Sequence, residues 1–393
     1  MPRDRRQDPI PYGHHWIDED DVAAVTAVLR GDWITQGPLI ERFEHALAAV
    51  AGARHAVSFS SGTAALHGAC FAAGIGPGDE VVTSPLSFAA SANCVLYLGG
   101  RPVFADVSPD TGNLDPEQAV RAITPLTKAL LPVDYAGHPA DLEAFRALAR
   151  DRGLCLIEDA SHAIGATLGG RPLGSIADLT TFSFHPVKTI TTGEGGAVTT
   201  DDDALAGALR LFRSHGITRS PEALTQDDLE PGPWYYEMQV LGYNYRITDI
   251  QCALGLSQLG RLGRFVARRR AIAARYDEAF GADPALRVPA RRPGAEPAWH
   301  LYPLRIRAER LRAGRRAIFE RLRARGLGVQ VHYVPTPLQP YYRKHFGHAP
   351  GDFPNAEAYY AGEISIPLFP MMSDADVGDV IDIVRDVIDE VRA

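Results

Sequence analysis

Lysine is scarce in this sequence. Only three of the 40 lysine and arginine residues are lysine, namely Lys128, Lys188 and Lys344. Arginine can replace lysine wherever a positive charge is enough, but only a primary amine that loses its proton can attack a carbonyl group and form an imine. Because nearly all other cations are arginine, the presence of Lys188 in the loop after a predicted strand indicates that an amine is needed at that position. A surface lysine without a role is the plain alternative.

Cysteine and long apolar segments are also scarce. The four cysteines lie far apart and form no CxxC pair, so we predict neither a disulfide framework nor a metal site. No window approaches the roughly 18 apolar residues of a membrane span, and the charged N-terminal segment lacks the apolar core of a signal peptide. We therefore expect a cytoplasmic protein without membrane contact.

The sequence lacks a basic stripe, and its formal net charge of −8 argues against nucleic acid as a partner. Its 393 residues, 46% of them hydrophobic, are too many for one small core, so two domains are expected. We place a large domain with an N-terminal arm at residues 1–255. A small C-terminal domain then occupies residues 256–393.

Strands and helices alternate along the first half of the chain. The strands are predicted at 56–59, 80–84, 102–107, 129–133, 154–158 and 180–184. Repeated alternation with nearly continuous apolar strands favours an α/β fold whose mainly parallel sheet is covered on both faces. The C-terminal region has a shorter α+β pattern, with strands predicted at 301–306, 328–333 and 364–366.

Ligands of such sheets bind at the carboxyl ends of the strands. We therefore expect one crevice to bring together the residues that follow the predicted strands, which are Ser61 to Thr63, Ser87, Phe88, Tyr135, Asp159, His162 and Lys188.

The turn at Ser61, Gly62 and Thr63 joins a strand to the start of a helix. The first backbone N–H groups of a helix have no partner within the helix and lie at the positive end of its dipole. Small residues there let an anion approach closely, so the turn is a candidate phosphate site. A simply capped helix is the alternative.

Asp159 comes at the end of one predicted strand, and Lys188 follows the next predicted strand. An amine, a carboxylate and a phosphate site together match the needs of pyridoxal phosphate. Its aldehyde forms an imine with a lysine, and a carboxylate keeps its pyridine nitrogen protonated. Ser183 can add a phosphate contact and Phe88 can cover the ring. Taken singly, Asp159 could instead cap a helix, Ser183 could be an ordinary strand residue and Phe88 could belong to the core.

Six motifs occur in this order along the chain: GDWITQGP, SSGTAAL, EDASHAIGA, FSFHPVKTITTGEGGAV, GYNYRITDIQCALGLSQL and VHYVPTPLQPYY. In combination they resemble the DegT/StrS-type nucleotide-sugar aminotransferases, from Ile10 to beyond Pro370. The residues of these motifs are most similar to those of the pseudaminic-acid branch of that family. The resemblance implies the aminotransferase fold of type I, with pyridoxal phosphate as cofactor and a homodimer whose active sites lie at the interface.

The resemblance also implies roles for individual residues. Lys188 would form the imine, Asp159 would bind the pyridine nitrogen and His162 would lie near the phenolic oxygen. The remaining cofactor contacts would be Gly62, Thr63 and Ser183 at the phosphate, Phe88 on the ring, and Asn244 reaching the phosphate of the neighbouring subunit. Candidate substrate contacts are His332, Tyr333, Arg213 and Arg246.

The activity implied is transfer of an amino group from L-glutamate to C4 of a UDP-linked 4-keto-6-deoxy-N-acetylhexosamine. The alternatives are an aminotransferase for a dTDP- or GDP-linked ketosugar and a pyridoxal-phosphate-dependent sugar dehydratase of the same fold. Relatives that perform dehydration can carry histidine in place of the lysine, so Lys188 favours transamination.

Overall fold

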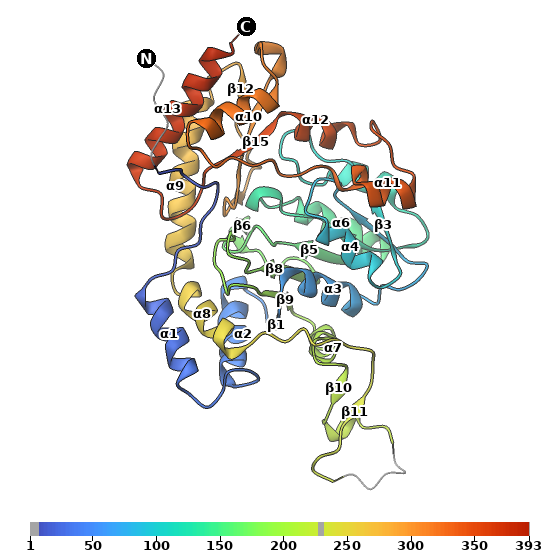
Figure 1. The fold of residues 1–393 in the computed structure, drawn as a ribbon. Coiled ribbons are helices and arrows are strands. Elements are labelled where there is room, and N and C mark those ends of the chain that lie inside the picture. The colour runs from blue at the N-terminus through green and yellow to red at the C-terminus, as the bar shows by residue number, and fades with distance from the viewer. Residues whose placement is uncertain (1–7, 227–231, 393) are drawn as a thin grey trace.

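The computed structural model describes residues 8–226 and 232–392. The first seven residues of the charged N-terminal segment therefore lie outside the described residues. The central feature is a seven-stranded sheet (Figure 1). In spatial order its strands are β1 (His55–Phe59), β9 (Gly196–Thr200), β8 (Leu179–Ser183), β5 (Cys155–Asp159), β4 (Thr127–Leu131), β2 (Glu80–Thr83) and β3 (Arg101–Phe104).

The sheet is mixed but mainly parallel. Strands β8, β5, β4, β2 and β3 pair in parallel, whereas β9 is antiparallel to both of its neighbours, β1 and β8. The six strands predicted for this half of the chain are all present, with ends that differ by a few residues. The predicted α/β fold class is confirmed.

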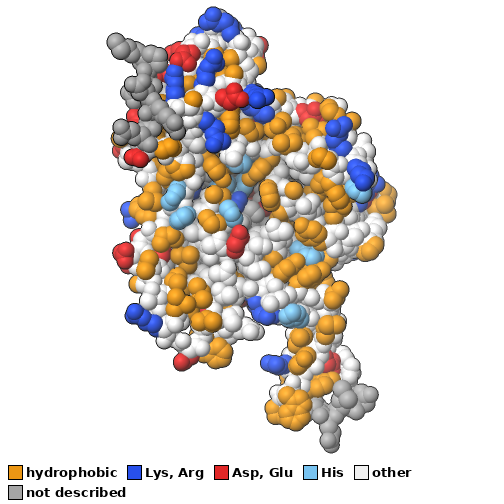
Figure 2. Space-filling view, in the orientation of Figure 1, with side chains coloured by type: hydrophobic (Ala, Val, Ile, Leu, Met, Phe, Trp, Pro, Cys, Tyr) orange, Lys and Arg blue, Asp and Glu red, His pale blue; other side chains and the backbone are white. Residues whose placement is uncertain are grey.

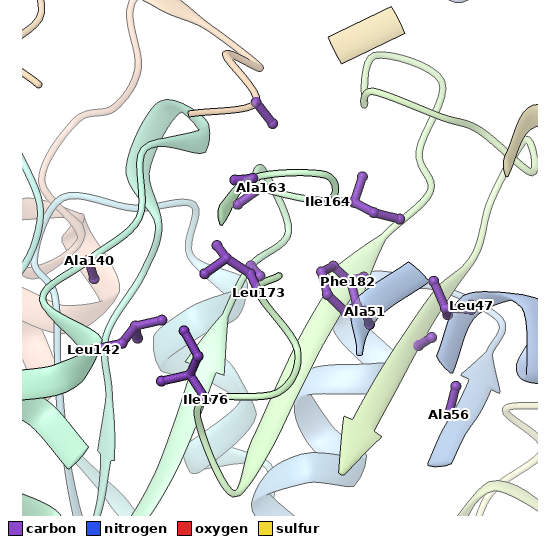
Figure 3. Close-up of a cluster of buried hydrophobic side chains, with 14 of the residues drawn as sticks. Leu47, Ala51, Ala56, Ala140, Leu142, Ala163, Ile164, Leu173, Ile176 and Phe182 are labelled. Carbon is purple, nitrogen blue, oxygen red and sulfur yellow. The ribbon is translucent and has the colours of Figure 1, made fainter. Parts of the chain in front are cut away.

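Helices cover both faces of the sheet. One face packs against α3 (Gly62–Ala72), α4 (Ala90–Leu96) and α7 (Asp203–Arg213). The other packs against α2 (Pro38–Ala51), α5 (Pro116–Ala122), α6 (Leu142–Arg152) and α8 (Asp249–Leu259). Figure 3 shows part of this second cluster, to which Phe182 of β8 and Ala51 of α2 both belong. Full burial of a side chain such as Phe182 contributes about 2 kcal/mol to folding.

The C-terminal region has its own core around a small antiparallel sheet of β12 (Leu286–Arg287), β14 (Tyr302–Ile306) and β15 (Glu363–Ile366). Three helices pack there: α9 (Leu262–Phe280), α10 (Arg315–Ala324) and α13 (Asp374–Glu390). Ser373 caps α13 in a reciprocal arrangement with Asp376.

Helix α9 belongs to both cores. Phe265 and Val266, near its start, are buried in the large cluster, whereas Ile272 and Tyr276 are buried in the small one. The predicted division between residues 255 and 256 falls within α8 and stays a prediction.

The strand predicted at 328–333 is wrong. Only Gln330 forms a bridge, with Ser365 of β15. The ladder ends there because the next available backbone donor, the N–H of His332, binds the side chain of Glu363 at 2.7 Å. At the other end, the N–H of Gly328 binds the carbonyl oxygen of Ile10 in the N-terminal arm.

The remaining elements lie around these two cores. They are α1 (Glu19–Leu29), α11 (Pro340–Phe346), α12 (Pro354–Gly362), the strands β6 (Thr167–Leu168), β7 (Arg171–Pro172) and β13 (Ala295–Glu296) of a small sheet, and the pair β10 (Ile217–Thr218) and β11 (Glu237–Met238). The β10–β11 pair projects from the body of the molecule (Figure 1). None of the helices in the described ranges has the length and apolar character needed to cross a membrane.

Candidate active site

A cavity of about 420 Å³ opens at the carboxyl ends of β1, β2, β5 and β8. Histidine side chains surround a hollow on the face drawn in Figure 2. The cavity brings together most of the predicted site residues, namely Gly62, Thr63, Phe88, Asp159, His162, Ser183, Lys188, His332 and Tyr333. His332 and Tyr333 come from the C-terminal part of the chain, so both parts of the molecule form the walls.

The start of α3 forms one end of the cavity. Ser61 caps this helix, because its Oγ accepts a hydrogen bond from the N–H of Ala64 at 3.1 Å. A Cβ added at Gly62 would lie 2.8 Å from Cβ of Ser183, so only glycine lets α3 approach β8 this closely. The free N–H groups of the first helical turn and the hydroxyl of Ser183 therefore meet at one place, which suits a phosphate group.

Asp159 is buried at the end of β5. Its Oδ2 accepts a hydrogen bond from the hydroxyl of Ser91 at 2.6 Å, and its Oδ1 accepts one from the N–H of Ser161 at 3.1 Å. Ser91 also shares a hydrogen bond of 2.8 Å with Ser87. These contacts fix the position of the carboxylate in the cavity wall.

Lys188 is half-buried in the loop after β8. Burial lowers the pKa of its amine from 10.5 to about 8, and the negative charge of Asp159 opposes part of that effect. A much larger fraction of the amine is therefore neutral near physiological pH than for an exposed lysine. A neutral amine is the form that can attack a carbonyl group.

Three histidines of the cavity share a low basicity. Burial and the nearby positive charge of Lys188 lower the pKa of His162, His300 and His332, the last to about 4. The rings of His162 and His300 lie 4.4 Å apart between centroids. Nε2 of His162 lies 3.3 Å from the hydroxyl of Tyr333, while its buried Nδ1 has no partner within the described part of the chain.

Three other predicted residues do not line the cavity. Arg213 binds Oε1 of Glu44 at 2.5 Å and the carbonyl oxygen of Ser58 at 2.8 Å, so it joins α7 to α2 and β1. Asn244 is exposed and Arg246 is half-buried, both in the segment before α8. The substrate roles of both arginines and the partner-subunit role of Asn244 stay predictions.

Tyr135, which was expected in the crevice, is buried behind it instead. Its hydroxyl donates a hydrogen bond of 2.5 Å to the carbonyl oxygen of His332. It therefore supports the cavity wall without being part of it.

Sequence reasoning missed several residues that line the cavity, among them Tyr12, Ser91, Glu194 and His300. Ser91 had a weak signal, since it lies one helical turn after Ser87, which was expected at the crevice. His300 directly precedes a predicted strand, and nothing in its spacing connects it to the site.

Comparison with known proteins agrees with this geometry. Residues 15–385 match the family described as the DegT/DnrJ/EryC1/StrS aminotransferase family. The chain belongs to this family. The aminotransferase is 43% identical over 385 residues to the spore coat polysaccharide biosynthesis protein SpsC of Bacillus subtilis, covering 98% of each chain.

Solved structures of similar proteins include Helicobacter pylori PseC, described as an aminotransferase involved in the biosynthesis of pseudoaminic acid. The aminotransferase is 33% identical to PseC with a TM-score of 0.89, covering 98% of this chain and 100% of that one. It is 32% identical to the PMP-form of Spr1654 from Streptococcus pneumoniae, with a TM-score of 0.90 and coverage of 97% and 99%.

Members of this family use pyridoxal phosphate, and the cavity of this aminotransferase fits that cofactor. Gly62 leaves the start of α3 open for a phosphate, and the buried Asp159 and the amine of Lys188 line the same space. Nδ1 of His162, which has no hydrogen-bond partner among residues 8–226 and 232–392, is available for a further polar contact. The residues needed at each end of the cofactor are therefore present within one cavity.

Proposed function

We propose that this aminotransferase moves an amino group from L-glutamate to C4 of a UDP-linked 4-keto-6-deoxy-N-acetylhexosamine. The observation that carries the proposal is the single cavity in which Lys188, Asp159 and the start of α3 meet His332 and Tyr333. The similarity to PseC over nearly the full length of both chains supports the sugar class and the pseudaminic-acid pathway.

Lys188 acts first as the covalent anchor and then as the group that moves protons. When bound, pyridoxal phosphate supplies an aldehyde and an electron-withdrawing ring that stabilises negative charge at the carbon next to the transferred nitrogen. The amine of Lys188, with its pKa near 8, takes a proton from the α-carbon of the donor and later returns one to the sugar carbon.

The other cavity residues hold the cofactor. Asp159, which Ser91 and the N–H of Ser161 hold in place, would bind the pyridine nitrogen. The first turn of α3, with Gly62, Thr63 and Ser183, would bind the phosphate. His162, which is neutral because burial lowers its pKa, would contact the phenolic oxygen, and Phe88 would cover the ring.

We further propose that the enzyme is a homodimer whose sites are shared between subunits. Asn244 is exposed outside its own cavity, so it is available to a partner's cavity. Exposed apolar side chains support an interface near the β10–β11 pair. Trp234 and Tyr236 lie just before β11, Met238 lies on it, and Leu241 and Tyr243 follow it.

We place the enzyme in the cytoplasm. The cysteines Cys70, Cys94, Cys155 and Cys252 are all free thiols, as is usual for proteins of a reducing compartment. The nucleotide sugar and L-glutamate proposed as substrates are small molecules, so no nucleic acid or membrane is part of the proposal.

The proposal is tested by measuring kcat/KM for UDP- and dTDP-linked 4-ketosugars with L-glutamate as donor. We expect amination at C4 of UDP-2-acetamido-2,6-dideoxy-4-hexulose sugars, with the L-arabino form preferred. Lys188→Ala is the control and should give no product.

Two outcomes would change the assignment. A preference of more than about tenfold for a dTDP sugar, roughly 1.4 kcal/mol, would contradict the UDP-linked substrate. Turnover that does not consume glutamate would contradict amino transfer and indicate the dehydratase instead.

A further inference from the structure

His332 lies at the cavity end of a chain of polar groups that continues into the small domain. Its Nδ1 is 2.8 Å from Oγ of Ser365, and that hydroxyl is 2.5 Å from Oε1 of Glu363. The other carboxyl oxygen of Glu363, Oε2, accepts the backbone N–H of His332 at 2.7 Å. Glu363 and Ser365 are both fully buried on β15.

The direction of these hydrogen bonds follows from the number of protons. A backbone N–H can only donate, so Oε2 of Glu363 must accept and Oε1 is left to face Ser365. When Glu363 is ionised, the single proton of Ser365 goes to Oε1. Oγ must then accept from Nδ1–H of His332, and the other ring nitrogen, Nε2, carries a lone pair.

Protonation of Glu363 reverses this chain. The carboxyl proton lies on Oε1 and is donated to Oγ of Ser365, so the Ser365 hydroxyl donates to Nδ1 of His332. The ring proton of His332 is then on Nε2. Since Nε2 makes no hydrogen bond to any described residue, it is the nitrogen available to a molecule in the cavity.

We propose that Glu363 and Ser365 form a proton relay that sets which ring nitrogen of His332 carries the proton. His332 thereby presents an acceptor or a donor at Nε2 to the molecule in the cavity. When Nε2 gives up its proton, Nδ1 receives that of Ser365 and Ser365 receives that of Glu363. The net change is one proton moved from Glu363 to the cavity, and Glu363 becomes a carboxylate.

The acidities of the two end groups agree with a relay. Burial raises the pKa of Glu363 to about 8, opposed by its hydrogen bonds to Ser365 and His332 and by the charge of Arg315. Burial and Lys188 lower the pKa of His332 to about 4, so its ring stays neutral while Glu363 titrates. The relay therefore changes the tautomer of His332 and leaves its charge unchanged.

Other titratable groups surround the two ends of the relay. Those facing His332 are Lys188, His162, His300, Tyr12 and Tyr333. Those near Glu363 are Arg315, Tyr135, Tyr359 and, on the neighbouring strand, Arg305. Burial lowers the pKa of His162 and His300 well below that of Glu363. It raises the pKa of all four tyrosines. Lys188 is therefore the neighbour whose pKa, about 8, lies in the same range as that of Glu363.

The relay rests on the proposed function in one respect, which is that the molecule facing His332 in the cavity is the reacting sugar. Amination of a ketone releases its oxygen as water, so a neutral donor that can also accept a proton suits that site. Glu363 and Ser365 act through His332 and are positioning residues.

The test is the tautomer of His332, measured by ¹⁵N NMR of histidine-labelled holoenzyme without sugar, with His332→Gln identifying the signals. In the wild type we expect the proton on Nδ1 well above pH 8 and on Nε2 well below it. In Glu363→Gln the side-chain oxygen must still accept the backbone N–H. The amide NH₂ therefore faces Ser365, and the ring proton should stay on Nε2 at every pH.

Ser365→Ala provides a second variant if Glu363→Gln does not fold. It removes the bridge, so the tautomer of His332 should no longer change with pH, while Ser365→Thr should restore the change. An unaltered pH-dependent switch in Ser365→Ala, or no switch in the wild type, would overturn the relay. Because no sugar is present, absence of amination activity would contradict the proposed function and leave this result intact.

Discussion

Lys188 carries its amine into a cavity where burial lowers the pKa to about 8. Borohydride reduction of the holoenzyme, followed by peptide mapping, should attach the cofactor to Lys188. Lys188→Arg should keep the positive charge and lose all turnover, because a guanidinium group cannot attack a carbonyl group. Labelling of Lys128 or Lys344 would contradict the assignment.

The pKa of Lys188 predicts how the cofactor-free protein takes up pyridoxal phosphate. The folded-state pKa lies below the usual 10.5, so the neutral amine prevails above about pH 8. The rate of uptake, followed by absorbance, should rise with pH and level off above about pH 8. A rate that keeps rising toward pH 10 would show that the amine titrates as an exposed lysine does.

Asp159 should contribute far more to rate than to cofactor binding. Asp159→Asn should retain cofactor but lose at least about 10²-fold in kcat, the scale seen when one preorganised electrostatic group is removed. Ser91→Ala leaves the carboxylate and removes one of its hydrogen bonds, which contributes about 1.5 kcal/mol. It should therefore cost only about tenfold, and near-normal kcat in Asp159→Asn would contradict the proposed role.

For individual residues, the sequence predicts a place in the site when few other side chains could supply the same chemistry. Lys188 and Asp159 were expected in the cavity because an amine and a carboxylate at strand ends have few equivalents. Ser91 and His300 were missed because a hydroxyl or an imidazole becomes part of a site only through tertiary contacts. Arg213 shows the converse, since its charge is engaged by Glu44 away from the cavity.

Among the elements, the approach of α3 to β8 controls the phosphate end of the cavity. In Gly62→Ala the new Cβ would lie 2.8 Å from that of Ser183, so the start of α3 must move. We expect a loss of about 1–3 kcal/mol in stability and a cofactor Kd at least tenfold weaker. Thermal unfolding and equilibrium dialysis measure the two effects.

Gly207→Ala is the matched control for this substitution. Gly207 lies within α7, and an added Cβ meets no atom within 4 Å. The change should leave cofactor binding unaltered and stabilise the helix by up to about 1 kcal/mol. Equal loss of cofactor in both variants would show that the close contact at Gly62 is unimportant.

The elements of the large domain could be predicted because apolar runs and turn residues mark its parallel strands. The structure of the segment at 328–333 could not be predicted, because its apolar pattern is typical of a strand although it forms only one bridge. Its backbone donor at His332 binds a side chain, Glu363, that is distant in sequence. Long-range contacts of this kind override local propensity.

For the whole molecule, the shared-site proposal predicts complementation between two inactive variants. Lys188→Ala and Asn244→Ala should each be inactive as homodimers. Mixed dimers should regain activity, because one of their two sites then has both an intact lysine and an intact asparagine. Activity is measured after unfolding and reassociating the mixture, and mixed dimers without activity would contradict sharing.

Helix α9 sets a limit on how this enzyme can be engineered. Phe265 and Val266 complete the core beneath the large sheet, while Ile272 and Tyr276 of the same helix complete the other core. A fragment that ends after residue 255 would leave the large core open to water. A chimaera in which a relative's sequence begins at residue 256 would bring mismatched side chains into the large core. A chimaera that exchanges the C-terminal region for that of a relative must therefore be joined within α9, between Val266 and Ile272, so that each core keeps its own half of the helix.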